Sequence, residues 1–171
     1  MKTLKASSPL ALADYAAAAL RKTPADSLVA IGMTGTRLGA VMRVDDAAPA
    51  DFLGTFLAQS LRDSGHERAI LIGYGPEDRA PRWFEVEAAM VDHGLPVETL
   101  VAVDGKNCTN LSTGDSEPYA PGASDLGLTL AVEGGAPVQH PTAEPQDTAA
   151  LAPLIAAARE RMGDFLSLIH I

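Results

Sequence analysis

Cysteine and aromatic residues are scarce in this chain of 171 residues. The one cysteine, Cys108, excludes a disulfide within the chain, and a metal site would need ligands of other residue types. Aromatic residues make up 5% of the chain, whereas hydrophobic residues make up 47%. The composition therefore predicts a folded core made mainly of Leu, Val, Ile and Ala rather than a disordered chain.

Basic residues and long apolar segments are also few. There are 13 Lys and Arg against 22 Asp and Glu, which gives a net charge of -9. A negative surface repels phosphate backbones and anionic lipids, so we expect neither a nucleic-acid nor a membrane partner. Asp14 and Arg21 interrupt the apolar N-terminal segment, and no segment approaches the roughly 20 apolar residues of a membrane span. We expect a soluble, cytoplasmic protein.

The spacing of apolar residues predicts the secondary structure. Helices are expected at residues 9–21, 49–63, 81–93 and 147–163, with a short one at 123–133. Strands are expected at residues 28–33, 38–44, 69–74 and 97–103, with a less regular one at 107–112 and a loop at 113–122. Phe84, Ala88 and Val91 are expected to face the core from the third helix.

The order of these elements predicts the fold class. The first two strands form a hairpin that turns at Thr34 and Gly35, and Asp104-Gly105 is typical of a second tight turn. Strands and helices then alternate from residue 38 to residue 103, which predicts two right-handed crossovers. We therefore expect a single α/β domain over residues 1–164, with a mixed, mainly parallel sheet, an N-terminal β-hairpin and flanking helices.

One set of motifs resembles a known family. Residues 23–45 read TPADSLVAIGMTGTRLGAVMRVD, and the chain also contains AILIGYG, GLPVETLVAVDGK and GGAPVQHPTAEP. Together they resemble domain-of-unknown-function family 4192, which occurs in actinobacteria and their phages, and the resemblance covers residues 8–160. It implies no established activity. Relatives often carry a Trp-rich, Cys-containing segment where this chain has KNCTNLSTGDSEPYAPG, so a site with paired cysteines cannot form here; Asp46 also stands where the family usually has Leu.

The C-terminal residues carry a different resemblance. LSLIHI, residues 166–171, is similar to the in-frame translation of the end of a widely used transposon-based sequencing adapter. The resemblance implies that residues 165–171 are a non-native tail and that the natural protein continues in another sequence. The alternative is a C-terminal strand or a docked apolar tail.

Arg43 and Asp45 are the first candidates for a binding site. They alternate along one strand, so they lie on the same face, close to its carboxyl end. Open α/β sheets bind ligands at that edge, where an Arg with carboxylates could hold a phosphate, a carboxylate or a metal. The alternative is a structural ion pair, with Asp45 near the N-terminus of the next helix.

Four further residues are candidate ligand contacts. Asp26 and Ser27 precede the first strand, where they either contact a ligand or bond to the local backbone. Tyr74 lies in a strand-to-helix segment, GYGPED, which lacks the Walker pattern of a phosphate loop. Trp83 follows that loop, and it either stacks on a ligand or packs in the core.

No catalytic signature accompanies these candidates. The sequence has no Gly-x-Ser-x-Gly elbow and no His-x-x-x-His spacing, so no catalytic or metal-ligating residue is assigned and no cofactor is indicated. The leading hypothesis is a non-catalytic binding or regulatory module with a small-molecule or protein partner. One alternative is an enzyme that acts on a small phosphorylated or carboxylated metabolite through Arg43 and Asp45. Another is a protein-interaction domain whose acidic surface meets a basic partner.

Overall fold

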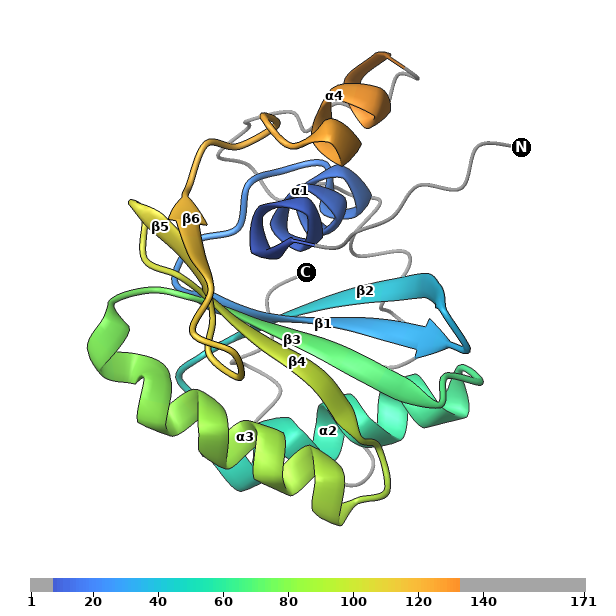
Figure 1. The fold of residues 1–171 in the computed structure, drawn as a ribbon. Helices are drawn as coiled ribbons and strands as arrows, with labels where there is room; N and C mark the ends of the chain where they lie inside the picture. Colours follow the sequence, from blue (N-terminus) through green and yellow to red (C-terminus); the bar gives the residue numbers. More distant parts are fainter. Residues whose placement is uncertain (1–7, 133–171) are drawn as a thin grey trace.

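A six-stranded sheet with helices on both faces forms the centre of the molecule (Figure 1). The computed structural model describes residues 8–132. The strands are β1 (Ser27–Thr34), β2 (Arg37–Asp45), β3 (Arg68–Tyr74), β4 (Val97–Val103), β5 (Asn107–Asn110) and β6 (Ser116–Pro118). The helices are α1 (Pro9–Leu20), α2 (Ala50–Asp63), α3 (Ala80–Asp92) and α4 (Asp125–Val132), and a 3-10 turn, η1 (Glu77–Arg79), precedes α3. The α/β class is confirmed.

The predicted elements within residues 8–132 are found close to their expected positions. β6 is the exception, because residues 113–122 were expected to be a loop. The helix expected at residues 147–163 and the tail at 165–171 lie outside the described residues, so both stay predictions. Within the described part of the chain, no helix is long and apolar enough to cross a membrane.

The expectation of a mainly parallel sheet is wrong. The strand order is β2-β1-β3-β4-β5-β6, and β3 with β4 is the one parallel pair among the described neighbours. The N-terminal hairpin places β1 between β2 and β3 and antiparallel to both, and β5 and β6 add two more antiparallel pairs beyond β4. The first crossover therefore passes over β1 instead of joining adjacent strands. Nevertheless β2, β3 and β4 run in the same direction, so their carboxyl ends meet at one edge of the sheet.

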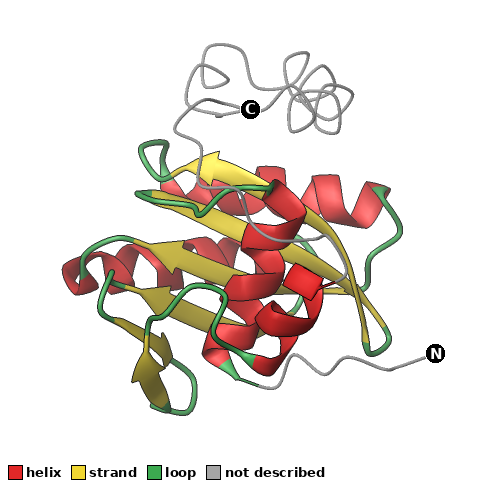
Figure 2. Ribbon diagram, turned by 90° about the horizontal axis from the view of Figure 1, so that it is seen from above, coloured by secondary structure: helices red, strands yellow, loops and turns green. Residues whose placement is uncertain are grey.

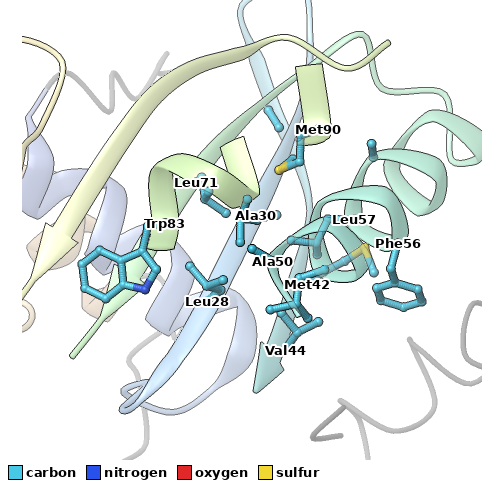
Figure 3. Packing of buried hydrophobic residues seen from close by; sticks show 14 of the residues in the cluster. Leu28, Ala30, Met42, Val44, Ala50, Phe56, Leu57, Leu71, Trp83 and Met90 are labelled. Atoms are coloured by element: carbon cyan, nitrogen blue, oxygen red, sulfur yellow. The ribbon is translucent and has the colours of Figure 1, made fainter. Parts of the chain in front are cut away.

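Each face of the sheet has its own apolar core. α2 and α3 cover one face, and α1 with α4 lies over the other, as the views from the side and from above agree (Figures 1 and 2). The first core joins the sheet to α2 and α3, and Figure 3 shows Trp83 and Met90 of α3 together with Leu28 and Leu71 of the strands. The second joins α1 to the other face through residues such as Ile31. Burial on both faces explains why the central strands are continuous apolar runs.

Two carboxylates attach α1 to distant parts of the chain. Ser8 caps the helix by accepting the backbone N–H of Ala11, and Glu117 of β6 accepts the N–H of Leu10 at 2.7 Å. Asp14, which is 3% exposed, accepts the backbone N–H groups of Gly122 and Ser124 and also the Ser124 hydroxyl. These bonds hold the segment between β6 and α4 against α1.

The inward face of α3 differs from the prediction. Trp83, Val86 and Met90 are fully buried, whereas Phe84 is 44% and Val91 is 49% exposed. The expected set of Phe84, Ala88 and Val91 also has helical spacing, but it is rotated by about one residue from the true face. The sequence pattern allows both sets, and the packing of the Trp83 indole on Gly73 of β3 fixes the observed one: a Cβ at Gly73 would overlap the ring.

A matched pair of substitutions on α3 tests this face. We expect Val86→Ala to lower the free energy of unfolding by about 2 kcal/mol, because it removes two buried methyl groups and leaves a cavity. Val91→Ala is the same change on the same helix at an exposed position, and we expect an effect within about 0.5 kcal/mol. Urea denaturation followed by Trp83 fluorescence measures both. Equal effects of the two substitutions would contradict the observed face.

Candidate functional site

The carboxyl edge of β2, β3 and β4 gathers most of the candidate residues. Ser27, the first residue of β1, pairs in register with Asp45 at the end of β2 and with Tyr74 at the end of β3. Residues opposite one another in a sheet project to the same face. These three residues therefore form one row at the edge of the sheet, on the face that α1 covers, although they are far apart in the sequence.

Arg43 and Asp26 flank this row. Arg43 pairs with Val29 of β1, one step further into the sheet, and its guanidinium donates to the backbone carbonyl of Ala25 at 3.4 Å. Asp26 is exposed and has a φ of 46°, in the left-handed region that few residues other than glycine adopt. Arg43 thus holds the backbone of the segment that precedes β1, and the strained Asp26 directs the turn into the strand.

A cleft of about 390 Å³ opens at this edge. Its walls come from four segments: the one before β1, the turn after β3, the turn after β4 and the segment after β6. We call it the edge cleft. It is lined by Pro24, Ala25, Asp26, Tyr74, Gly75, Pro76, Val103, Asp104, Gly105 and Tyr119. Ligand pockets typically measure about 300–1,000 Å³, so the edge cleft has the size of a small-molecule site.

The two tyrosines of the edge cleft are held in an apolar environment. Tyr74 is 2% exposed, and Tyr119 packs against the same core beside it. Burial is the main reason that the pKa of Tyr119 is raised to about 12 and that the pKa of Tyr74 is raised well above its usual value of 10.0. Both side chains therefore stay neutral phenols, able to donate and accept hydrogen bonds.

Three hydroxyl groups near this edge are buried without a hydrogen-bond partner among the described residues. They belong to Thr23, Ser27 and Tyr74. A buried polar group without a partner costs about 1–3 kcal/mol, and each such group calls for an explanation. Tyr74 is also one of the lining residues of the edge cleft.

The charged groups that line the edge cleft are carboxylates. Asp26 and Asp104 are both exposed, and no Lys, Arg or His is among the described residues that line it. The Oδ1 atom of Asp104 accepts the backbone N–H groups of Lys106 and Asn107 at 2.8 and 2.7 Å. These bonds hold the pKa of Asp104 below its usual value of 3.8, so it stays negatively charged.

A second hollow of about 220 Å³ lies on the other face of the same edge. It is lined by Glu77, Ala102, Asp104, Asn107, Thr109, Leu111 and Ser116. Asp104 therefore contributes to both hollows, because it lies at the end of β4 where the two faces meet. The second hollow is rich in neutral polar groups: the hydroxyls of Thr109 and Ser116, which lie 2.9 Å apart, and the amide of Asn107.

Trp83 lies beneath the site, within the core. Its side chain is fully buried, and its indole N–H donates to Asp46 at 2.8 Å. Asp46, which is 3% exposed, also accepts from Arg82 at 2.7 Å and from Arg79 at 3.3 Å. This Asp46 cluster ties the end of β2 to the start of α3, and Trp83 acts as a positioning residue for the turn at Gly75 and Pro76.

The structure brings five of the six candidates to one edge but gives them different places. Asp26 and Tyr74 line the edge cleft, whereas Ser27, Arg43 and Asp45 lie beside it and Trp83 lies below. Asp104 and Tyr119 were not among the candidates from the sequence. Asp104 was assigned to a turn, which is correct, and the position of that turn directly after a central strand is the signal that could have identified it.

The described residues offer no metal centre or reactive thiol. Within residues 8–132, no group of three His, Cys, Asp or Glu side chains is arranged to hold a metal ion. Cys108 is fully buried in β5, and burial raises the pKa of its thiol to about 12. A thiol that stays protonated is a poor nucleophile, so Cys108 has a packing role.

Comparison with known proteins gives a family and no closer relative. The model of the family described as Domain of unknown function (DUF4192) matches residues 13–163, which confirms the resemblance seen in the sequence. No curated protein matches the chain, and no solved structure matches it.

A substitution of Asp46 tests how much its buried charge contributes to the free energy of unfolding. We expect Asp46→Asn to lower the free energy of unfolding by about 1–2 kcal/mol, because Arg79 and Arg82 would lose a charged partner, although water reaches both arginines. Asp92→Asn, at the exposed end of α3, is the control and should change the free energy of unfolding by no more than about 0.5 kcal/mol. Denaturation followed by Trp83 fluorescence measures both. An Asp46 variant as stable as the control would mean that the cluster does not hold α3.

The tyrosines predict how the protein responds to alkali. All three tyrosines of the chain, Tyr15, Tyr74 and Tyr119, have raised pKa values because of burial. Above pH 10 the unfolded state therefore binds fewer protons than the folded state, so the free energy of unfolding falls as the pH rises from 10 towards 12. Phenolate absorbance should appear above pH 10 in the folded protein and near pH 10 in denaturant. Phenolate near pH 10 in a chain that is still folded would contradict the burial.

Proposed function

Since the chain belongs to the DUF4192 family, a family of unknown function, we propose its function from the site: a non-catalytic module that binds a small organic molecule in the edge cleft. The observation that carries the proposal is the edge cleft itself, which is lined in part by Tyr74, a residue whose buried hydroxyl has no hydrogen-bond partner among the described residues. A ligand with a carbonyl or a ring nitrogen would accept from this hydroxyl. Binding would then recover the free energy that the unpaired group costs.

The position of the edge cleft supports this proposal. It lies at the carboxyl ends of β3 and β4, which are parallel neighbours joined by a crossover through α3. In open α/β sheets, ligands bind in the crevice outside the carboxyl ends of the strands. The turns that carry Gly75 and Gly105 bring backbone close to this crevice, and both glycines have positive φ values.

The charge of the edge cleft favours a neutral or cationic ligand. Asp26 and Asp104 would repel a phosphate or a carboxylate, and no basic side chain is among the described residues that line the cleft. A phosphorylated or carboxylated metabolite held by Arg43 and Asp45 is therefore the weaker candidate. Arg43 has a structural contact instead, with the carbonyl of Ala25.

The side chains at the edge cleft support binding more than catalysis. A nucleophile there would need a base within hydrogen-bond reach, and a histidine is the usual one. His66 lies near the opposite end of the strands, where its ring packs against Gly32 and Gly39. His93 follows the last residue of α3 and contacts Thr55 of α2. A module that only binds its ligand does not need a histidine at the cleft.

The substitution Tyr74→Phe separates binding from folding. We expect the unliganded variant to be as stable as the parent protein or up to about 1 kcal/mol more stable, because it loses an unpaired buried hydroxyl. Tyr15→Phe is the matched control: the Tyr15 hydroxyl donates to the carbonyl of Gly39 at 3.0 Å, so its loss should destabilise by about 1 kcal/mol. Thermal denaturation without ligand measures both variants.

The same variants test ligand binding. In thermal melts against neutral and cationic heteroaromatic compounds, sugar phosphates and carboxylates, a ligand at about 100 times its Kd adds roughly 2.7 kcal/mol of stability. We expect such a shift from a neutral or cationic compound, a smaller shift in Tyr74→Phe and an unchanged shift in Tyr15→Phe. A panel that produces no shift, or a shift that Tyr74→Phe retains in full, would count against the edge cleft as the binding site.

A further inference from the structure

The second hollow extends the site towards a particular class of ligand. Resting on the proposed function, we infer that the ligand is a nucleoside-like glycoside: a nitrogen heterocycle in the edge cleft, joined to an uncharged sugar in the second hollow. The two hollows share Asp104, at the point where the end of β4 separates the two faces of the sheet. A ligand that passes around this residue can occupy both.

The edge cleft has the chemistry of a heterocycle site. Val103, Pro24 and the rings of Tyr74 and Tyr119 make it mainly apolar, which suits an aromatic face. Its polar groups are of two kinds. The Tyr74 hydroxyl can donate to a carbonyl oxygen or ring nitrogen, and the carboxylates of Asp26 and Asp104 can accept from N–H groups. A nitrogen heterocycle presents both acceptors and N–H donors along one edge.

The second hollow has the chemistry of a sugar site. The hydroxyls of Thr109 and Ser116 and the amide of Asn107 both donate and accept hydrogen bonds, as the hydroxyls of a sugar do. Thr109 and Ser116 are paired across β5 and β6, so their hydroxyls form one polar surface. Leu111 and Ala102 add an apolar floor on which the carbon atoms of a ring can pack.

Asp104 is suited to the junction between the two parts. Its Oδ1 atom is fixed by the backbone N–H groups of Lys106 and Asn107, which leaves Oδ2 as an acceptor for a ligand. A fixed carboxylate oxygen accepts well from a pair of neighbouring sugar hydroxyls. Glu77 adds a second negative charge to the hollow, so the same arrangement disfavours a phosphate on the sugar.

The test uses the full chain and four sets of probes. For adenosine, guanosine, cytidine and uridine, calorimetry compares the nucleoside with its free base, its 5′-monophosphate and ribose. We expect at least one nucleoside to bind about ten-fold or more tightly than its base, and its monophosphate to bind more weakly than the nucleoside. Equal affinity for base and nucleoside, or tighter binding of the monophosphate, would overturn the inference.

Thr109→Val tests the sugar half of the site separately. The variant keeps the shape of the side chain and its place in β5, and it removes one hydroxyl from the second hollow. We expect it to weaken binding of the nucleoside about two- to ten-fold and to leave binding of the base unchanged. Thr99→Val is the control, since Thr99 lies on β4 away from its carboxyl end and lines neither hollow.

The outcomes distinguish the inference from the proposed function. If a base binds, Tyr74→Phe weakens it and Thr109→Val changes nothing for the nucleoside, the edge cleft is a binding site and the sugar assignment is wrong. If no nucleoside or base binds but another neutral or cationic compound gives a shift that Tyr74→Phe reduces, the inference fails and the proposed function stands. If no compound of either panel binds, both fail.

Discussion

The buried carboxylate of Asp46 is the interaction on which the arrangement of the site depends. It binds the indole N–H of Trp83 and the guanidinium groups of Arg79 and Arg82, and it stands directly after the last residue of β2. Trp83 in turn packs on Gly73 of β3. One charge therefore joins the ends of two strands, which β1 separates in the sheet, to the start of α3. The turn that forms one wall of the edge cleft lies between these fixed points.

Two further carboxylates fix loop segments on the other face of the sheet. Asp14 of α1 binds the segment at residues 122–124, and Glu117 of β6 binds the first turn of α1. Tyr119 lies between these two attachments, so its ring is held against the core beside Tyr74. Two of the segments that bound the edge cleft, those after β3 and after β6, are thus fixed by carboxylates. Such segments can form a defined binding surface although they lack the backbone hydrogen bonds of a sheet.

The sequence was sufficient to predict the helices and strands but not to predict which strands pair. Apolar runs placed β1 to β4 within about a residue, and β1 and β3 are continuous apolar runs because they are buried on both faces. The pattern could not show that β1 lies between β2 and β3. The hairpin depends on residues that are close in the sequence, whereas its position in the sheet depends on contacts between distant residues. Likewise, two helical sets on α3 were equally periodic, and only the packing of Trp83 on Gly73 selects one. The candidate residues near strand ends were found, whereas Asp104 and Tyr119 come from turns that lack periodicity.

The position of Asp46 shows how stability and binding are distributed in this protein. The buried charge of Asp46 accepts hydrogen bonds from Arg79, Arg82 and Trp83. By contrast, the hydroxyl of Tyr74 has no partner among the described residues. Replacing such an uncompensated group by an apolar one can be neutral or stabilising, so its presence calls for an explanation. The satisfied charge fixes the strand ends and the start of α3, and the unsatisfied hydroxyl is one of the observations on which the proposed binding site rests.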